Sequence, residues 1–217
     1  MKTKITPIFA IMLLAVAAFA QVPQEKTVTV FGAKINYIEA GDAVKPKVIM
    51  LHGLGGSIAN WATNTGALAQ NYHVIALDQV GFGKSDKPEL KYRVGTFVDF
   101  LDKFMAELKI EKASLVGNSM GGWVAGLMAV KYPNRVEKIV LADAAGLVPE
   151  NFSEAQIHRL NNSTRDEIRA NMKLIFANPM LQTNEALVDQ FMTLRVMAND
   201  GGTINSLIES IKRREDF

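Results

Sequence analysis

The chain has 217 residues, a formal net charge of +2 and no cysteine. The lack of cysteine excludes disulfides and zinc–thiolate centres, and the near balance of charge excludes the basic surface that a nucleic-acid partner needs. Because no metal-binding or nucleotide-binding motif is visible, we expect neither a metal nor a cofactor. The length is enough for one sizeable domain, or for a core with a small lid.

The first twenty residues have the pattern of a signal peptide. Lys2 and Lys4 form a basic start, an unbroken apolar run covers Ile8 to Ala20, and Ala18-Phe19-Ala20 is a small-x-small cleavage pattern. The run is shorter than the roughly 20 apolar residues that span a bilayer. We therefore expect residues 1–20 to be removed and the protein to be exported, to the periplasm or outside the cell, with no stable membrane anchor. An uncleaved N-terminal anchor is the alternative.

The next part of the chain alternates strands with helices. The first two strands alternate apolar with polar residues, with a turn at Gly32-Ala33, as half-exposed antiparallel strands do. The later strands are short apolar runs, typical of buried parallel strands. The predicted strands are 27–30, 34–38, 48–51, 72–77, 113–117 and 136–142. With helices predicted around Trp61 and Leu68, over 97–108 and over 121–132, this order indicates an α/β fold with a mostly parallel sheet and helices on both faces.

The chain after Gly146 contains only helical patterns, over 164–175, 185–197 and 203–211. Ser163 and Thr183 stand where N-caps are expected. We therefore predict two parts after the signal peptide, with residues 21–146 forming the N-terminal part of a core and residues 147–217 forming a helical cap.

Ser119 lies in Gly117-Asn118-Ser119-Met120-Gly121, between a predicted strand and a predicted helix. A Gly-x-Ser-x-Gly in that position predicts a nucleophile elbow, a turn that lifts the serine hydroxyl above the sheet. The turn is so tight that the residues two before and two after the serine must be nearly without side chains. The backbone N–H of Met120 opens the following helix, so it can stabilise negative charge on a substrate oxygen.

Four motifs in this order resemble the α/β-hydrolase superfamily, from about Thr27 to the end of the chain. They are His-Gly-Leu-Gly-Gly at 52–56, Asp-Gln-Val-Gly-Phe-Gly-Lys-Ser at 78–85, Gly-Asn-Ser-Met-Gly-Gly at 117–122 and Leu-Ala-Asp-Ala-Ala-Gly at 141–146. The nearest likeness is to capped members such as small esterases and carbon–carbon bond hydrolases. The resemblance implies that Ser119 is the catalytic nucleophile and that the N–H of Leu54 joins that of Met120 in the oxyanion hole. The implied partner is a small-molecule ester or acyl substrate.

The resemblance also implies an acid and a histidine on loops that follow the cap. The chain has three histidines, His52, His73 and His158, and none is predicted to be that base. We expect His52 to brace its loop through hydrogen bonds. Asp143 is a possible acid, although a strand-end aspartate that binds loop backbone is the simpler interpretation. The sequence therefore predicts a C-terminally truncated serine hydrolase with negligible activity alone. A carbon–carbon bond hydrolase and a non-catalytic, ligand-binding or truncated relative are the alternatives.

Overall fold

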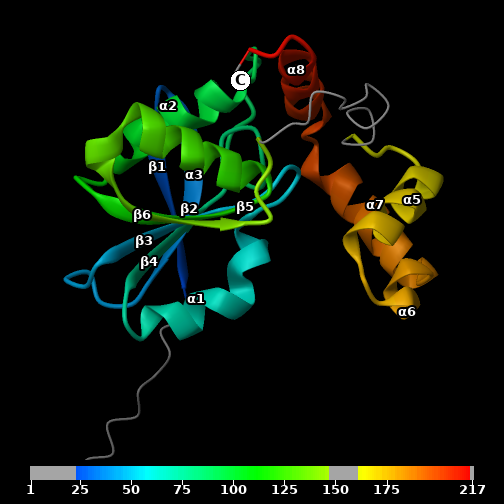
Figure 1. The fold of residues 1–217 in the computed structure, drawn as a ribbon, viewed down its shortest axis with the longest axis horizontal. Helices are drawn as coiled ribbons and strands as arrows, with labels where there is room; N and C mark the ends of the chain where they lie inside the picture. The colour runs from blue at the N-terminus through cyan, green and yellow to red at the C-terminus, as the bar shows by residue number, and fades with distance from the viewer. Residues whose placement is uncertain (1–22, 147–160, 216–217) are drawn as a thin grey trace, which may run out of the picture.

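The computed structural model describes residues 23–146 and 161–215 (Figure 1). The predicted signal peptide, residues 1–20, lies outside these ranges and stays a prediction, as does everything said of His158. Within the described residues, no helix combines the length and the apolar composition needed to cross a membrane.

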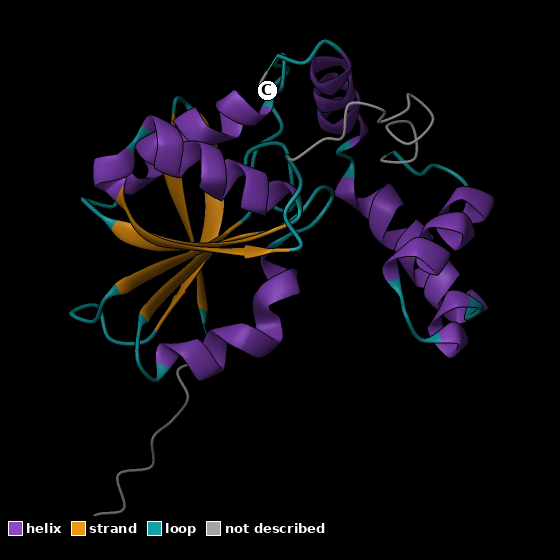
Figure 2. Cartoon of the chain, in the orientation of Figure 1, coloured by secondary structure: helices purple, strands orange, loops and turns teal. Residues whose placement is uncertain are grey.

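A six-stranded sheet forms the centre of the molecule, in the order β1-β2-β4-β3-β5-β6 (Figures 1 and 2). The strands are β1 (Gln24–Val30), β2 (Ala33–Ala40), β3 (Lys47–Leu51), β4 (His73–Leu77), β5 (Ala113–Asn118) and β6 (Val136–Ala142). β1 and β2 form an antiparallel hairpin, β2 pairs antiparallel with β4, and the remaining pairs are parallel. The predicted α/β fold with a mostly parallel sheet is therefore confirmed.

The turn of the first hairpin lies at Phe31-Gly32, one residue earlier than the sequence predicted. Both residues have positive φ, 50° at Phe31 and 85° at Gly32, as a tight turn between twisted antiparallel strands requires. Ala33 instead begins β2, where it pairs with Val30.

Helices cover both faces of the sheet (Figure 1). They are α2 (Val94–Glu107) and α3 (Met120–Lys131) on one face, and the 3-10 turn η1 (Ile58–Trp61) with α1 (Ala62–Ala69) on the other; a second 3-10 turn, η2 (Pro133–Arg135), precedes β6. Alternate residues of β3 face opposite sides. Ile49 and Leu51 pack in the larger cluster with α2 and α3, whereas Val48 and Met50 pack in the smaller one with Trp61. The prediction that β3 is covered on both faces is therefore confirmed.

β6 was predicted as a buried strand, and this is wrong for its side chains. Ile139, Val140 and Leu141 are 40%, 54% and 50% exposed. β6 is the last strand in the order of the described sheet, and it pairs only with β5. An apolar strand at a sheet edge has no neighbour to cover it, which promotes edge-to-edge association.

Val140→Lys should therefore raise the soluble yield of the 217-residue chain without lowering its midpoint of thermal unfolding. Lysine on an exposed edge strand disfavours pairing with another edge, and a side chain that is already half exposed loses little packing. Soluble protein after centrifugation and light scattering on heating measure the effect. An unchanged aggregation rate would show that this edge does not drive association.

The C-terminal helices are α5 (Arg165–Ile175), α6 (Pro179–Gln182), α7 (Glu185–Ala198) and α8 (Gly201–Lys212). The N-caps are Thr164 and Asn184, each one residue after the predicted Ser163 and Thr183. The Thr164 side chain accepts a hydrogen bond from the Glu167 amide, and the Glu167 carboxylate accepts one from the Thr164 amide. The two residues therefore form a capping box at the start of α5.

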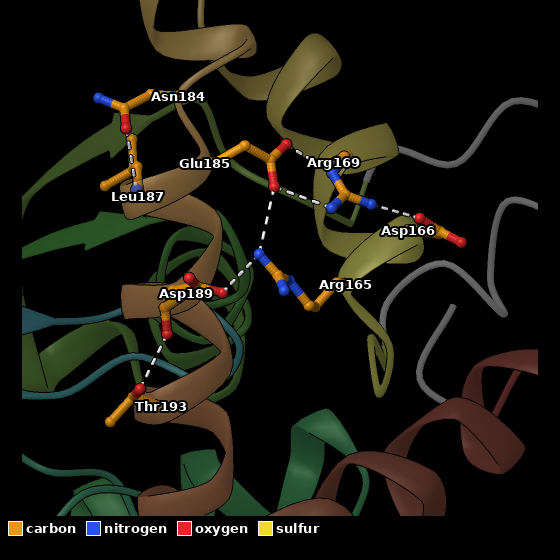
Figure 3. Close-up of polar contacts among 8 residues, drawn as sticks. All are labelled: Arg165, Asp166, Arg169, Asn184, Glu185, Leu187, Asp189 and Thr193. Carbon is orange, nitrogen blue, oxygen red and sulfur yellow. Dashed lines mark hydrogen bonds and ion pairs between the residues drawn. The ribbon is translucent and has the colours of Figure 1, made fainter.

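α5 and α7 pack through a small apolar cluster and a network of surface ion pairs. Ile168, Met172 and Val188 form the cluster. Arg169 on α5 binds Glu185 on α7, with Nε 2.7 Å from Oε1, as Figure 3 shows. These helices form a body beside the sheet in Figure 1, as a cap does.

α8 packs on the main core, unlike α5 and α7. Its apolar stripe, Ile204, Leu207 and Ile208, is buried in the same cluster as the sheet and α2. Ser206 Oγ accepts a hydrogen bond from the amide of Tyr92 at 2.7 Å. α8 therefore ties the cap helices to the loop that precedes α2.

Candidate active site

Ser119 lies between β5 and α3 with a backbone conformation that non-glycine residues seldom adopt, φ 51° and ψ −118°. Its amide donates to the carbonyl of Ala142 at 3.1 Å. Its carbonyl accepts from the amides of Gly122, Trp123 and Ala145, at 2.9, 3.2 and 3.0 Å. A residue held this way stores strain that the surrounding bonds impose, as is common at catalytic turns.

The two glycines that flank Ser119 are sterically required, as the sequence predicted. A Cβ on Gly117 would lie 2.2 Å from the carbonyl oxygen of Gly121. A Cβ on Gly121 would lie 2.1 Å from the carbonyl oxygen of Leu51. Both contacts are with backbone, which cannot move aside as a flexible side chain can. The predicted elbow geometry is therefore present.

The two amides predicted to stabilise an oxyanion lie on segments that meet at the elbow. Met120 is the first residue of α3, and Leu54 is the second residue of a turn closed by the Gly56 amide and the Gly53 carbonyl at 3.1 Å. A Cβ on Gly53 would lie 3.2 Å from the Ser119 Cβ, so the turn lies against the serine. Within the described residues, neither the Leu54 amide nor the Met120 amide donates a hydrogen bond. Both donors are therefore available to a ligand.

His52 braces this turn, as predicted, and its two hydrogen bonds fix its tautomer. Nδ1 lies 2.7 Å from the carbonyl oxygen of Gly53, so it carries the proton and donates. Nε2 lies 3.0 Å from the amide nitrogen of Gln79 and accepts. Protonating Nε2 would set two donors against each other. Burial, the largest cause, accordingly lowers the pKa of His52.

The free energy of unfolding should therefore decrease as the pH falls below about 6.5, the ordinary pKa of histidine. Below that pH, His52 binds a proton in the unfolded chain but stays neutral in the folded chain. The free energy of unfolding therefore falls by about 1.4 kcal/mol per pH unit, until the pH reaches the lower pKa that His52 has in the folded chain. Above it, His52 is neutral in both states and contributes no slope. Urea unfolding over a series of pH values measures this.

The control for this pH dependence is His73, whose pKa burial also lowers. His52→Gln should remove most of the slope, whereas His73→Gln should remove less because the His73 ring is less enclosed. An unchanged slope in His52→Gln would contradict the assignment.

Asp78 holds the neighbouring loop, as expected. Its Oδ2 accepts from the amide of Lys84 at 2.8 Å and from Asn36 Nδ2 at 3.0 Å, and its Oδ1 accepts from the amide of Ile58 at 2.7 Å. A Cβ on Gly83 would lie within 2.5 Å of this carboxylate. Asp78 is therefore structural, with its oxygens fully engaged.

The described residues do not place a histidine where it could deprotonate Ser119. Both ring nitrogens of His52 are engaged, and His73 begins β4, at the opposite end of the parallel strands from Ser119. Asp143 follows β6 with φ 49° and an exposed side chain. The simpler interpretation expected a backbone amide to donate to this carboxylate, and no such hydrogen bond is found among the described residues. The part of the chain that the structure describes also contains no cluster of side chains suited to hold a metal ion.

One group beside the site was missed from the sequence. Arg195 on α7 reaches the turn of Leu54, where its Nη1 lies 3.3 Å from the position of a Cβ on Gly55. It binds Asp200, which is 1% exposed. The sequence did contain a signal for a buried ion pair: a single arginine among the apolar residues Leu194, Val196 and Met197, five residues before an aspartate.

The chain is similar to several known proteins. The chain is 33% identical over 175 residues to the dihydrolipoyllysine-residue acetyltransferase component of the acetoin cleaving system of Cupriavidus necator, covering 79% of this chain and 45% of that protein. It is 31% identical over 195 residues to a 2-hydroxy-6-oxo-6-(2'-aminophenyl)hexa-2,4-dienoic acid hydrolase of Metapseudomonas resinovorans, covering 82% of this chain and 67% of that one. The chain thus spans about half to two thirds of the length of these relatives.

The structure resembles that of a bacterial membrane phospholipase A, with a TM-score of 0.73 and 28% identity over 88% of this chain and 63% of the other. The model of the alpha/beta hydrolase fold family matches residues 46–192, a segment that begins just before β3 and includes the elbow and most of α7. On this match, and on the sheet and elbow described above, the chain belongs to the α/β-hydrolase fold family.

Proposed function

We propose that this chain supplies the nucleophile and the oxyanion hole of a serine hydrolase that cleaves ester or similar acyl bonds of small molecules. The observation that carries the proposal is the strained conformation of Ser119 beside two amides, those of Leu54 and Met120, that donate no hydrogen bond to any residue that the structure describes. A hydroxyl exposed on such a turn is positioned to attack, and preformed donors favour the charge that attack creates.

The chemistry takes two steps. The Ser119 hydroxyl loses its proton to a base and its Oγ attacks the substrate carbonyl carbon, while the two amides bind the oxygen that becomes negative. The tetrahedral intermediate expels the alcohol, which takes up a proton, and leaves an acyl-serine. Water then attacks the acyl group, releasing the acid and restoring the serine. Each oxyanion donor contributes about 3 kcal/mol to the transition state. The described residues supply the nucleophile and donors, and the base is not among them.

A fluorophosphonate probe tests the proposal because it reports attack by the serine without requiring turnover. We expect the probe to modify Ser119 selectively, as shown by peptide mass spectrometry, and Ser119→Ala to lose the label. Oxyanion donors alone retain about 10³-fold to 10⁴-fold catalysis over water when triad members are missing. Labelling of the 217-residue chain should therefore be slow but specific, and its turnover of p-nitrophenyl esters negligible.

Ser114 on β5 is the matched control residue, because it precedes the same elbow but lies within the strand. Ser114→Ala should be labelled at Ser119 like the unchanged chain. Equal labelling of several serines, or labelling that persists in Ser119→Ala, would refute the assignment of the nucleophile.

Carbon–carbon bond hydrolysis is the second candidate, and the named activity of the Metapseudomonas resinovorans relative favours it. The elbow of this chain also carries Asn118, whose Nδ2 donates to the Ala142 carbonyl at 3.1 Å and whose Oδ1 lies beside Gly53. Loss of the absorption of a 2-hydroxy-6-oxohexa-2,4-dienoate, compared with release of nitrophenol from an ester, separates the two activities.

A further inference from the structure

The outer half of the turn that carries Leu54 has few bonds of its own. The Gly53 carbonyl is held by His52 and by the Gly56 amide. Beyond it, the amides of Leu54 and Gly55 donate no hydrogen bond within the described residues. Gly55 adopts φ +67°, in the left-handed region. The position of the Leu54 donor therefore depends on what packs against this turn from outside.

Arg195 of α7 is the group that packs there. Its guanidinium Nη1 lies 3.3 Å from the Cβ position of Gly55, closer than most Cβ contacts, so the arginine packs tightly against the turn. Three acceptors fix the guanidinium: Asp200 Oδ1 at 2.6 Å, Asn161 Oδ1 at 3.1 Å and the Asn162 carbonyl at 3.4 Å. Such a planar group, held at several nitrogens, is a rigid contact surface.

Asp200 is unusual for a residue that serves only as a partner in an ion pair. Its side chain is 1% exposed, and its Oδ2, 3.9 Å from the Cβ position of Gly55, has no hydrogen-bond partner among residues 23–146 and 161–215. A buried carboxylate oxygen left unpaired is unfavourable, and such groups are rare in folded proteins. Here the carboxylate holds Arg195 at the junction of α7 and α8, facing the turn.

We propose that Arg195, fixed by Asp200, is a positioning residue that holds the Leu54 amide in place for the oxyanion, and so couples the placement of the cap helices to the active site. This inference rests on the proposed function. Arg195 acts through the backbone of Gly55, without touching the reacting atoms. Withdrawing α7 would release the turn, and the site would lose one of its two donors.

Two measurements on the 217-residue chain test whether Arg195 positions the Leu54 amide; we call this contact of Arg195 and Asp200 with the turn the latch. Arg195→Met keeps the length of the side chain and removes the guanidinium. We expect faster amide hydrogen exchange in the segment 53–58, because the turn loses its outer support. We also expect the rate of Ser119 labelling at saturating fluorophosphonate to fall by about 10²-fold, since misplacement of about 1 Å has an effect of that size. The probe concentration at half-maximal rate should change less than the maximal rate.

Arg169→Met is the matched control, because Arg169 is also a cap arginine paired with carboxylates, but its partner Glu185 begins α7, ten residues before Arg195 (Figure 3). It should change neither measurement. If Arg195→Met does not fold, the same two measurements are made on Asp200→Asn, because asparagine has nearly the same size as aspartate but lacks its charge. Unchanged exchange and unchanged labelling in the Arg195 or Asp200 variant would overturn the latch. If the unchanged chain is not labelled at all, the proposed function fails, and the exchange of segment 53–58 alone decides whether the latch exists.

Discussion

Gly121→Ala should destabilise the folded chain by about 3 kcal/mol or more, at the upper end of the range for overpacking a core. The new Cβ would lie 2.1 Å from the carbonyl oxygen of Leu51 and 2.7 Å from that of His52. Both obstacles are backbone atoms of the central sheet and the loop that follows it. Relief requires α3 to move away from β3, which would also displace the elbow. Urea unfolding measures the loss of stability, and loss of Ser119 labelling should accompany it.

Gly126→Ala is the control, because Gly126 lies in the same helix and, apart from the nearby backbone of that helix, no atom of the described residues lies within 4 Å of its Cβ position. This substitution should stabilise the chain by about 0.5–1 kcal/mol, through the helix propensity of alanine. Opposite signs for the two variants would show that contact geometry, and not helix propensity, makes position 121 a glycine. Similar small effects would mean that the elbow is looser than described.

Arg195→Met should reduce the free energy of unfolding by about 3–5 kcal/mol, because it leaves the carboxylate of Asp200 buried without its counter-charge. The Asp200 side chain is 1% exposed, so water cannot replace the lost partner. Thermal and urea unfolding measure the change. In the double variant Arg195→Met/Asp200→Leu, most of this loss should be recovered, since apolar residues can replace a buried ion pair at little cost.

Arg169→Met supplies the comparison for burial. Arg169 binds Glu185 through two nitrogens, at 2.7 and 2.8 Å, and also binds Asp166 (Figure 3). Glu185 and Asp166 are largely exposed, so the loss of stability should be much smaller than in Arg195→Met, despite the greater number of charged contacts. An equal loss in the two arginine variants would contradict the view that burial decides the strength of the Arg195 pair.

The local features of this fold could be predicted from sequence because short segments determine them. The apolar run of β3 and the flanking glycines of Ser119 each specify their conformation within a few residues. N-caps were displaced by one residue, since Ser163 next to Thr164, and Thr183 next to Asn184, compete for the same role.

The features that the sequence did not predict depend on contacts between distant segments. β6 has the composition of a buried strand, and only its place at the end of the described sheet leaves it exposed. The apolar stripe of α8 was visible, but not that it packs on the core with Tyr92. The position of Arg195 beside the site could not be predicted, because no residue pattern within α7 indicates that this helix faces Gly55. The proposed donor role of Leu54 came from resemblance to a family, and the structure adds that its amide donates no hydrogen bond within the described part of the chain.

A crystal structure of the phosphonate adduct of Ser119 tests the central claim most directly. The account predicts one phosphonyl oxygen within about 2.7–3.1 Å of both the Leu54 and the Met120 amide nitrogens. An adduct whose oxygens point away from these amides, or a serine that remains unmodified while its neighbours react, would contradict it.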